Sequence, residues 1–282
     1  MTVSHIQSAG SGGSAQARQM TAAQRVLAIL ETFDEDHLVL SLSDIGRRAG
    51  LTLSTTHRLV GELRDWGALE RSAEGRYAIG MRILELGSLE PQGLHLREVA
   101  LPYLGDLQAA MNANVHLAVR DGHDTVYVES LRARNGANVL SRLGGRWPLH
   151  ATGTGQVLLA HAPQQFQDEV LALPLRKYTR KSITDPAELR RVLADVRRTG
   201  VAVADEQITA NVFAVAVPIR GPRDRVIAAL GVTMHRDTST PAAALPALST
   251  AARAISRALG APSANRAPSD PTRSRPSASA SI

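Results

Sequence analysis

The sequence predicts an α+β protein in which a small unit of three helices and a hairpin precedes a larger mixed α/β domain. In residues 21–87, three stretches have apolar residues at helical spacing, and two short alternating stretches follow them. In residues 88–260, helical patterns are interspersed with apolar strand patterns. The two ends differ from both, because they are rich in Ser, Ala, Gly or Pro. We therefore expect residues 1–19 and 261–282 to be disordered tails.

The composition is that of an ordinary globular protein without cysteine chemistry. Of the 282 residues, 44% are hydrophobic and 21% are charged. Because there is no Cys, disulfides, thiolate zinc sites and a cysteine nucleophile are excluded. No stretch approaches the length of apolar sequence that spans a membrane, and the polar start has no apolar signal core. We expect a cytoplasmic protein.

The net charge of +6 suggests an anionic partner, but the charge is unevenly placed. Residues 24–87 carry eight Lys and Arg against ten Asp and Glu, whereas residues 88–260 carry 20 against 15. The first segment is therefore not basic overall. If it binds a nucleic acid, the position of individual side chains must account for it.

The first two helices are expected near residues 21–33 and 43–49. Thr21 is a plausible N-cap for the first helix, and a polar stretch, DEDH, follows it. For the second helix, Ser43 is the expected N-cap and Gly50 closes the helix.

The third helix is expected from about Ser54 to Trp66, with Trp66 included in its buried stripe and Gly67 ending it. The segments ALERS and RYAIG then alternate like two strands around a short turn, AEG.

The second domain is expected to combine paired strands with covering helices. The segment DPAELRRVLADVRRTG has Asp185 as a cap, Pro186 at the first helical position and Gly200 just past the end. Two near-continuous apolar runs predict strands covered on both faces. In chain order the expected strands are 115–122, 124–131, 138–144, 213–219 and 226–235, and the expected helices are 96–113, 153–162, 185–199 and 240–259.

The third predicted helix begins with small hydroxyl residues. Helix, tight turn, helix and hairpin follow in the order of a winged helix-turn-helix, whose second helix enters the major groove by its N-terminal turn. Short hydroxyl side chains allow close approach to phosphates or base edges, and Arg58 lies within reach of a guanine edge. We expect DNA contacts from Arg25, Thr52, Ser54, Thr55, Thr56, His57, Arg58, Arg71 and Arg76, of which the last two flank the hairpin tip.

Two other interpretations of this segment stay open. Ser and Thr residues before a helix are ordinary caps, and a hairpin after a helix is common. A winged helix can also serve protein–protein contacts alone. Arg58 together with the hydroxyl cluster argues against that second alternative.

Several segments resemble the IclR family of bacterial transcription regulators. The DNA-binding half of the family is matched by QRVLAILETF, LSLSDIGRRAGLTLSTTHRLVGELRDWGALERS and GRYAIGMRILELG. The effector half is matched, in order, by LREVALPYLGDLQ, RWPLHATGTGQVLLAH, YTRKSITDPAELRRVLADVRRTGVAVADEQ and AVAVPIRG. The resemblance covers about residues 21–258, which is nearly everything outside the two tails.

The resemblance implies an N-terminal winged helix-turn-helix over residues 20–80, a linker helix over 81–97 and a C-terminal GAF-like α/β effector-binding domain over 98–260. It also implies a homodimer, often assembled as a homotetramer, on a double-stranded DNA operator. The implied effector is a small metabolite, often acidic or aromatic. Members of the family act as repressors or as activators.

The resemblance further implies an effector pocket between the sheet and the loop that opens the GTGQVLL helix. Gly153 and Thr154 match the loop and helix start that hold the polar end of the ligand, where free backbone N–H groups suit a carboxylate. The other positions are carried over by strand register: Val139, Leu143, Asp205, Val212, Ala214, Gly231 and Thr233. The alternative for the small residues among them, above all Gly231 and Ala214, is that they only fill the core.

Three departures from the family pattern bear on the ligand. Ala214 stands where many members have a cysteine, Ala204 where many have an acidic residue, and Asn211 where the family has a glycine. The expected pocket is therefore more apolar than in acid-binding members, and we expect an aromatic or amide-like effector.

An enzyme is the main alternative function, with His116, His150, Asp205 or Glu206 as acid–base groups. The nine histidines are scattered and no HExxH occurs, which argues against a metal site. The GTGQ segment lacks the serine of a nucleophile elbow. We expect no catalysis, no metal and no cofactor.

Overall fold

The computed structural model describes residues 20–34, 36–89, 91–134, 136–137, 139 and 141–265. The expected disordered tail 1–19 lies outside the described residues, as does all of the second tail after residue 265. Residues 262–265, which we expected to be disordered, form a short 3-10 helix, η2 (Pro262–Asn265). The chain divides into two compact units, with the boundary between residues 90 and 91.

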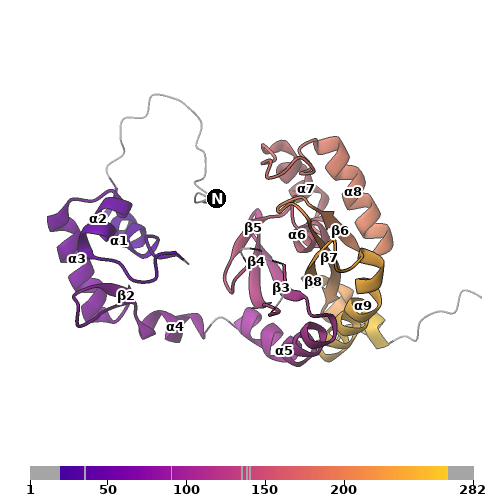
Figure 1. Ribbon diagram of the computed structural model, residues 1–282, viewed down its shortest axis with the longest axis horizontal. Coiled ribbons are helices and arrows are strands. Elements are labelled where there is room, and N and C mark those ends of the chain that lie inside the picture. Colours follow the sequence, from indigo (N-terminus) through magenta and orange to yellow (C-terminus); the bar gives the residue numbers. More distant parts are fainter. Residues whose placement is uncertain are drawn as a thin grey trace, which may run out of the picture. The chain divides into compact units, whose positions relative to one another are not determined.

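The first unit begins with three helices and a two-stranded hairpin in the predicted order, and a fourth helix follows the hairpin (Figure 1). The three helices and the hairpin are α1 (Ala22–Leu30), α2 (Leu42–Ala49), α3 (Leu53–Trp66), β1 (Leu69–Arg71) and β2 (Tyr77–Ile79). The two strands are antiparallel, with Leu69 opposite Ile79. Ile29, Ile45 and Leu59 come from the three helices and are fully or almost fully buried in one core.

The ends of these helices follow local sequence signals with one exception. Thr21 caps α1 through a capping box, and Gly50 and Gly67 end α2 and α3 in the left-handed conformation, as predicted. The expected cap Ser43 is wrong, because α2 begins earlier, and the hydroxyl of Ser41 accepts the backbone N–H of Asp44.

Trp66 is not part of the buried stripe of α3. Its side chain is 51% exposed at the last position of the helix, and the guanidinium of Arg82 lies 5.6 Å from the centre of its ring. The end of β2 passes close to the end of α3, since a Cβ atom at Gly80 would lie 2.3 Å from the carbonyl oxygen of Gly67. Only glycine fits that close approach.

The single linker helix expected over residues 81–97 is instead found as two helices. The first, α4 (Met81–Gly87), ends before Ser88, and the second, α5 (Pro91–Met111), begins at a proline. Ser88 and Leu89, after the first helix, lie in a turn. Helix α5 covers most of the helix predicted near 96–113 but begins earlier and ends at Met111.

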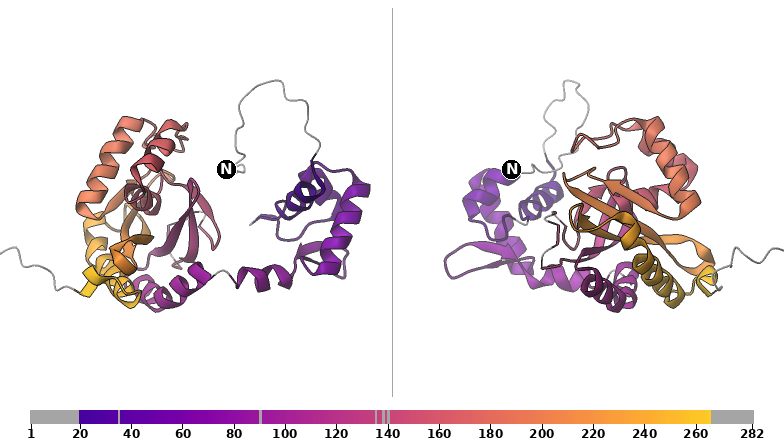
Figure 2. Two further views of the ribbon diagram at one scale, coloured as in Figure 1. Left: turned by 180° about the vertical axis from the view of Figure 1, so that it is seen from behind. Right: turned by 45° about the vertical axis from the view of Figure 1, so that its right-hand side comes forward.

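The second unit is built on one antiparallel sheet of six strands in the order β5-β4-β3-β8-β7-β6 (Figures 1 and 2). The strands are β3 (Asn114–Asp121), β4 (Asp124–Leu131), β5 (Arg146–Pro148), β6 (Ala202–Asp205), β7 (Val212–Arg220) and β8 (Val226–His235).

The strand expected over residues 138–144 is not found among the described residues of that segment. The described residues of that segment, Val139 and 141–144, are not in a strand, and the partner of β4 is β5 further along the chain. Gly144 has a left-handed φ of 73°, and its N–H donates to the carbonyl of Tyr127. The segment therefore meets β4 through a turn at Gly144 and Gly145 and not as a strand.

Helices cover both faces of this sheet (Figure 2). Helices α5 and α9 (Pro241–Ala258) pack on one face. Helices α6 (Gly153–Ala160), α7 (Gln164–Ala172) and α8 (Pro186–Thr199) form a second core with the other face. The predicted Asp185 cap and Gly200 end of α8 are confirmed. None of the described helices has the length and apolar character needed to cross a membrane.

Candidate functional site

The first turn of α3 presents its hydroxyl groups to solvent. Thr52 caps the helix, and its hydroxyl accepts the backbone N–H of Thr55 at 3.4 Å and donates to the hydroxyl of Thr55 at 3.0 Å. Ser54 is exposed beside it, with 3.3 Å between its Oγ and the Oγ1 of Thr52. The capping role therefore coexists with an exposed hydroxyl cluster at a helix N-terminus, the arrangement that suits a phosphate.

Arg58 is the exposed cation nearest to this cluster along the helix. Its side chain is 61% exposed and pairs with Glu62 one turn on, at 2.6 Å between Nη1 and Oε1. An ion pair between two exposed side chains contributes little stability, so a phosphate or base edge can replace the carboxylate at small cost. His57, beside it, is exposed as well.

Thr56 cannot contact DNA. It is fully buried, and its hydroxyl donates to the carbonyl of Thr52 at 2.9 Å. It also sets the packing of the two helices, because a Cβ atom at Gly46 of α2 would lie 2.9 Å from its Oγ1. The expectation for Thr56 is therefore corrected: it holds α2 against α3.

The two arginines of the hairpin are exposed, but each makes a contact within the unit. The guanidinium of Arg71 lies 5.7 Å from the ring centre of Tyr77, and Arg76 donates to the carbonyl of Val39 at 3.3 Å. Arg25 is half-buried on α1. The structure thus leaves Thr52, Ser54, His57 and Arg58 as the exposed part of the predicted set on α3, with Thr55 half-buried.

The acidic stretch after α1 is partly neutralised within the unit. Asp34 is largely buried and accepts from Arg48 at 2.6 Å and from the Nδ1 of His37 at 2.6 Å. Its negative charge is therefore paired. Glu35, in the same stretch, lies outside the described residues.

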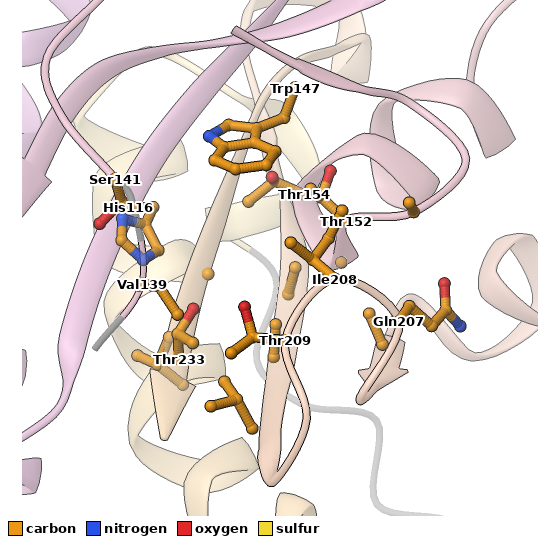
Figure 3. Close-up of a pocket in the computed structure, with 18 of the residues that line it drawn as sticks. His116, Val139, Ser141, Trp147, Thr152, Thr154, Gln207, Ile208, Thr209 and Thr233 are labelled. Atoms are coloured by element: carbon orange, nitrogen blue, oxygen red, sulfur yellow. The ribbon is translucent and has the colours of Figure 1, made fainter. Parts of the chain in front are cut away.

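The second unit holds a cavity between the N-terminus of α6 and the sheet (Figure 3). Its empty space is about 600 Å³, a value that includes open solvent. No Lys, Arg, Asp or Glu lines it among the described residues. The lining residues are His116, Tyr127, Val139, Ser141, Trp147, Ala151, Thr152, Gly153, Thr154, Ala204, Gln207, Ile208, Thr209, Val212, Ala214, Val215, Ala216, Gly231, Val232 and Thr233.

Small residues bring α6 close to the sheet at this cavity. A Cβ atom at Gly231 would lie 2.9 Å from the Cγ2 of Thr154, and one at Gly153 would lie 3.4 Å from the Cβ of Ala216. Thr152 caps the helix by accepting the N–H of Gly155. The N–H groups of Gly153 and Thr154, which come before Gly155, have no acceptor inside the helix and are available to a ligand.

Polar groups in the cavity are buried and incompletely hydrogen-bonded. Among the described residues, the Oγ of Ser141 and the Oγ1 of Thr154 have no hydrogen-bond partner, although both residues are at most 4% exposed. Burial raises the pKa of Tyr127 to about 12. The hydroxyl of Thr154 lies near that of Tyr127 and acts to lower the pKa of Tyr127, but the two hydroxyls are not in hydrogen-bond geometry. The hydroxyls of Ser141 and Thr154 are therefore free to bind a ligand.

His116 is the titratable imidazole of the cavity. Burial, aided by the charge of Arg132, lowers its pKa to about 4, so the ring is neutral at physiological pH. The ring stacks on Tyr127 at 4.8 Å between centroids, and Nδ1 lies 3.2 Å from the Oγ of Ser130.

The loop between β6 and β7 covers one side of the cavity with Gln207, Ile208 and Thr209 (Figure 3). Gln156 of α6 donates to the Oε1 of Gln207 at 2.8 Å. The loop is bounded by two non-glycine residues with positive φ, Glu206 at 51° and Asn211 at 60°. Asparagine tolerates this conformation better than most residues, which explains how Asn211 replaces the family glycine.

Most of the residues expected in this pocket lie in its lining, namely Val139, Gly153, Thr154, Val212, Ala214, Gly231 and Thr233. Two do not. Leu143 is 56% exposed outside the cavity, because the expected strand is a loop. Asp205 forms an exposed ion-pair cluster with Lys181 and Arg236 instead.

Sequence reasoning missed several lining residues. Trp147, Tyr127, Ser141 and the loop residues 207–209 were not singled out, and His116 was considered only as an acid–base group. The alternation of β3 could have placed His116 inside, since Val115 and Leu117 face the opposite core. The loop residues have no periodicity and carried no such signal.

The acid–base groups considered for an enzyme occupy different surroundings. His150 bonds the carbonyl of Arg176 through Nε2 at 3.0 Å, and Glu206 pairs with Lys181 at 2.7 Å. Neither residue lines the cavity that contains His116. Among the described residues, no three His, Asp or Glu side chains gather to hold a metal ion.

Known protein families match both units. The family described as bacterial transcriptional regulator IclR C-terminal matches residues 91–258, and the IclR helix-turn-helix domain matches residues 22–73. The HTH-type transcriptional regulator XynR of Escherichia coli is 33% identical over 244 residues, covering 85% of this chain and 97% of that protein. The Pca operon regulatory protein of Acinetobacter baylyi is 28% identical over 212 residues, 73% of this chain and 76% of that protein.

Solved structures of IclR proteins are also similar to this chain. An IclR homolog from Microbacterium hydrocarbonoxydans, complexed with 4-hydroxybenzoate, is 38% identical with a TM-score of 0.79, covering 84% of this chain and 98% of that chain. The IclR protein of Thermotoga maritima is 26% identical with a TM-score of 0.72, covering 84% and 98%.

Proposed function

The chain belongs to the IclR family of bacterial transcriptional regulators, and we propose that the start of α3 reads its operator while the cavity beside α6 binds its effector. The observation that carries the second part is the cavity itself. It is mainly apolar, has no charged side chain in its described lining, and contains two buried hydroxyls without partners. Such a site is built for a small ligand with few polar groups.

The ligand that suits this lining best is a monocyclic aromatic acid. Trp147, labelled in Figure 3, and the stacked rings of His116 and Tyr127 offer flat surfaces for a ring. The start of α6 offers N–H groups and the hydroxyl of Thr154 to a carboxylate. A 38% identical homolog was crystallised with 4-hydroxybenzoate, which is a ligand of this class.

On the DNA side, the proposed contacts are the exposed residues of α3 and the arginines of the hairpin. Thr52, Ser54 and Thr55 would bind phosphates, and Arg58 would bind a base edge after leaving Glu62. Arg71 and Arg76 would contact the neighbouring backbone, and His57 and Arg25 complete the set. We also propose that the protein acts in the cytoplasm as a homodimer or homotetramer and has no catalytic activity.

The proposed regulation is a shift between two states of the protein. An effector changes operator affinity only by its differential affinity for the two states, which is typically about 1–3 kcal/mol. The direction of the change, and thus repression or activation, follows from which state binds DNA.

The DNA assignment is tested with Arg58→Ala in a gel shift on the DNA upstream of the protein's own gene. We expect specific binding to weaken by about 1–3 kcal/mol, or about 5-fold to 150-fold, because a base contact is lost. Arg64→Ala is the matched control, since Arg64 lies on the same helix, is exposed and pairs with Asp65. Equal losses in the two variants would contradict a base-reading role for Arg58.

The effector assignment is tested in the same assay by adding ring acids such as benzoate and 4-hydroxybenzoate. A change in operator affinity that saturates with the ligand would support the proposal. If no ring acid binds the protein, as measured by calorimetry, the proposed ligand class is wrong.

A further inference from the structure

One corner of the cavity is formed by His116 of β3 and Ser141 of the loop before β5, and we call these two residues the polar corner. They are 2% and 3% exposed. Both line the cavity and are labelled in Figure 3, as are Thr152 and Thr154. Arg132 lies near both residues of the polar corner. Its guanidinium donates to the carbonyl of Ser141, and its positive charge helps to lower the pKa of His116.

His116 is held in place, and its imidazole lines the cavity. Its ring is fixed by the stacking on Tyr127 and by the contact between Nδ1 and Ser130. No protein partner is found for Nε2 among the described residues. In the pairing of β3 with β8, the residue opposite His116 is Gly231, which has no side chain to cover the imidazole.

Ser141 is held through its backbone, which leaves its side chain available. Arg132 donates to its carbonyl from Nε at 2.9 Å and from Nη2 at 2.6 Å, and its N–H donates to the carbonyl of Val139. Its hydroxyl has no partner in the described part of the chain. A buried hydroxyl without a partner is costly, so a ligand group that pairs with it gains affinity.

The polar corner therefore offers an uncharged ring nitrogen and a hydroxyl to one ligand group. A hydroxyl group matches both, because it can donate to one and accept from the other. A second carboxylate fits poorly, since no charged side chain lines the described cavity to offset its burial. A bare ring would leave both protein groups unpaired.

Building on the proposed function, we infer that the polar corner makes the protein selective for aromatic acids that carry a ring hydroxyl. Ser141 and His116 would bind that hydroxyl while the carboxylate lies at the start of α6. Sites that hydrogen-bond a ligand hydroxyl discriminate strongly against analogues without it, because the buried polar groups are then left unpaired.

The test is isothermal titration calorimetry of the full chain with benzoate, 3-hydroxybenzoate, 4-hydroxybenzoate and terephthalate. We expect at least one hydroxybenzoate to bind about tenfold more tightly than benzoate. We expect terephthalate, which has a second carboxylate, to bind no more tightly than benzoate. In Ser141→Ala, the preference for the hydroxyl should fall to within about twofold while the affinity for benzoate is kept.

Thr125→Val is the matched control. Thr125 also has a buried hydroxyl without a partner among the described residues, but it does not line the cavity. Its variant should keep the full preference. His116→Gln serves as a second variant of the polar corner and should reduce the preference as Ser141→Ala does.

The outcomes separate this inference from the proposed function. If benzoate and the hydroxybenzoates bind with equal affinity, or Ser141→Ala weakens all of them equally, the inference is wrong while the aromatic-acid site stands. Tighter binding of terephthalate would also overturn it. If none of the four compounds binds, the proposed ligand class fails, and the inference fails with it.

Discussion

The two faces of the six-stranded sheet are both apolar and buried, but they are made of residues of different size. Along β7, Phe213, Val215 and Ile219 pack against α5 and α9. The alternate residues, Ala214 and Ala216, face α6 and the cavity. The same alternation holds on β8, where Leu230, Val232 and Met234 lie on the first face and Ala229, Gly231 and Thr233 on the second.

This difference shows how one sheet can provide stability and a binding site together. Large side chains of β7 and β8 fill the interior between the sheet and α5 and α9, and their burial contributes hydrophobic stabilisation. Small residues on the α6 face let the helix approach and leave space for a ligand. The following predictions test whether the two faces have these separate roles.

The largest expected effect is on the large-residue face. Phe213 is 1% exposed, and Phe213→Ala should lower the free energy of unfolding by about 3–5 kcal/mol, because a large cavity replaces the ring. Urea denaturation measures this change. Ala216→Gly, on the same strand but the other face, should cost only about 1 kcal/mol. Similar losses in the two variants would show that the faces do not differ in this way.

The next effect is on the cavity face and concerns binding. Thr154→Trp should fill the cavity at the start of α6 and weaken the ligand about 100-fold or more, which is about 3 kcal/mol. DNA binding without ligand should be retained, which the gel shift checks together with correct folding. A ligand response unchanged by this substitution would place the pocket elsewhere.

A smaller effect concerns the pH dependence of stability and the imidazole on the cavity face. The pKa of His116 in the folded protein is about 4, below the ordinary value of 6.5, so the unfolded chain takes up a proton first as the pH falls. Stability should therefore decrease between about pH 6.5 and pH 4, by up to about 3 kcal/mol, and this contribution should level off below pH 4.

Urea titrations of the wild type and His116→Gln over this pH range isolate that contribution. The variant should show a shallower decrease in stability, because it lacks the His116 contribution. His150 and His161, whose pKa values are also lowered, are present in both proteins and affect both profiles alike. Identical pH profiles would mean that His116 is not kept neutral by burial.

The sequence predicted elements well where the signal is local. The end of α3 at Gly67 and the cap, proline and glycine around α8 were all predicted, because each depends on a few neighbouring residues. Ser41 and Ser43 illustrate the limit. Both can cap a helix, and the packing of Leu42 against the core accompanies the earlier start.

The candidate site residues show the same difference between local signals and tertiary packing. Thr56 precedes the buried Leu59 and Val60 by three and four residues, so helical spacing could have placed it in the core. By contrast, Ile208 and Thr209 reach the cavity only because β6 and β7 pair and carry their loop there. Such contacts depend on tertiary structure, and local sequence does not reveal them.

The cavity also bears on how such a sensor can diversify. Every described residue of its lining lies between His116 and Thr233, whereas every proposed DNA contact precedes Tyr77. After a gene duplication, one copy could gain a new inducer by substitutions at a few lining positions without a change in the genes it controls. The same separation makes the chain a starting point for engineered biosensors, in which a library at Ser141, Trp147 and Thr209 would alter the compound detected while the promoter stays fixed.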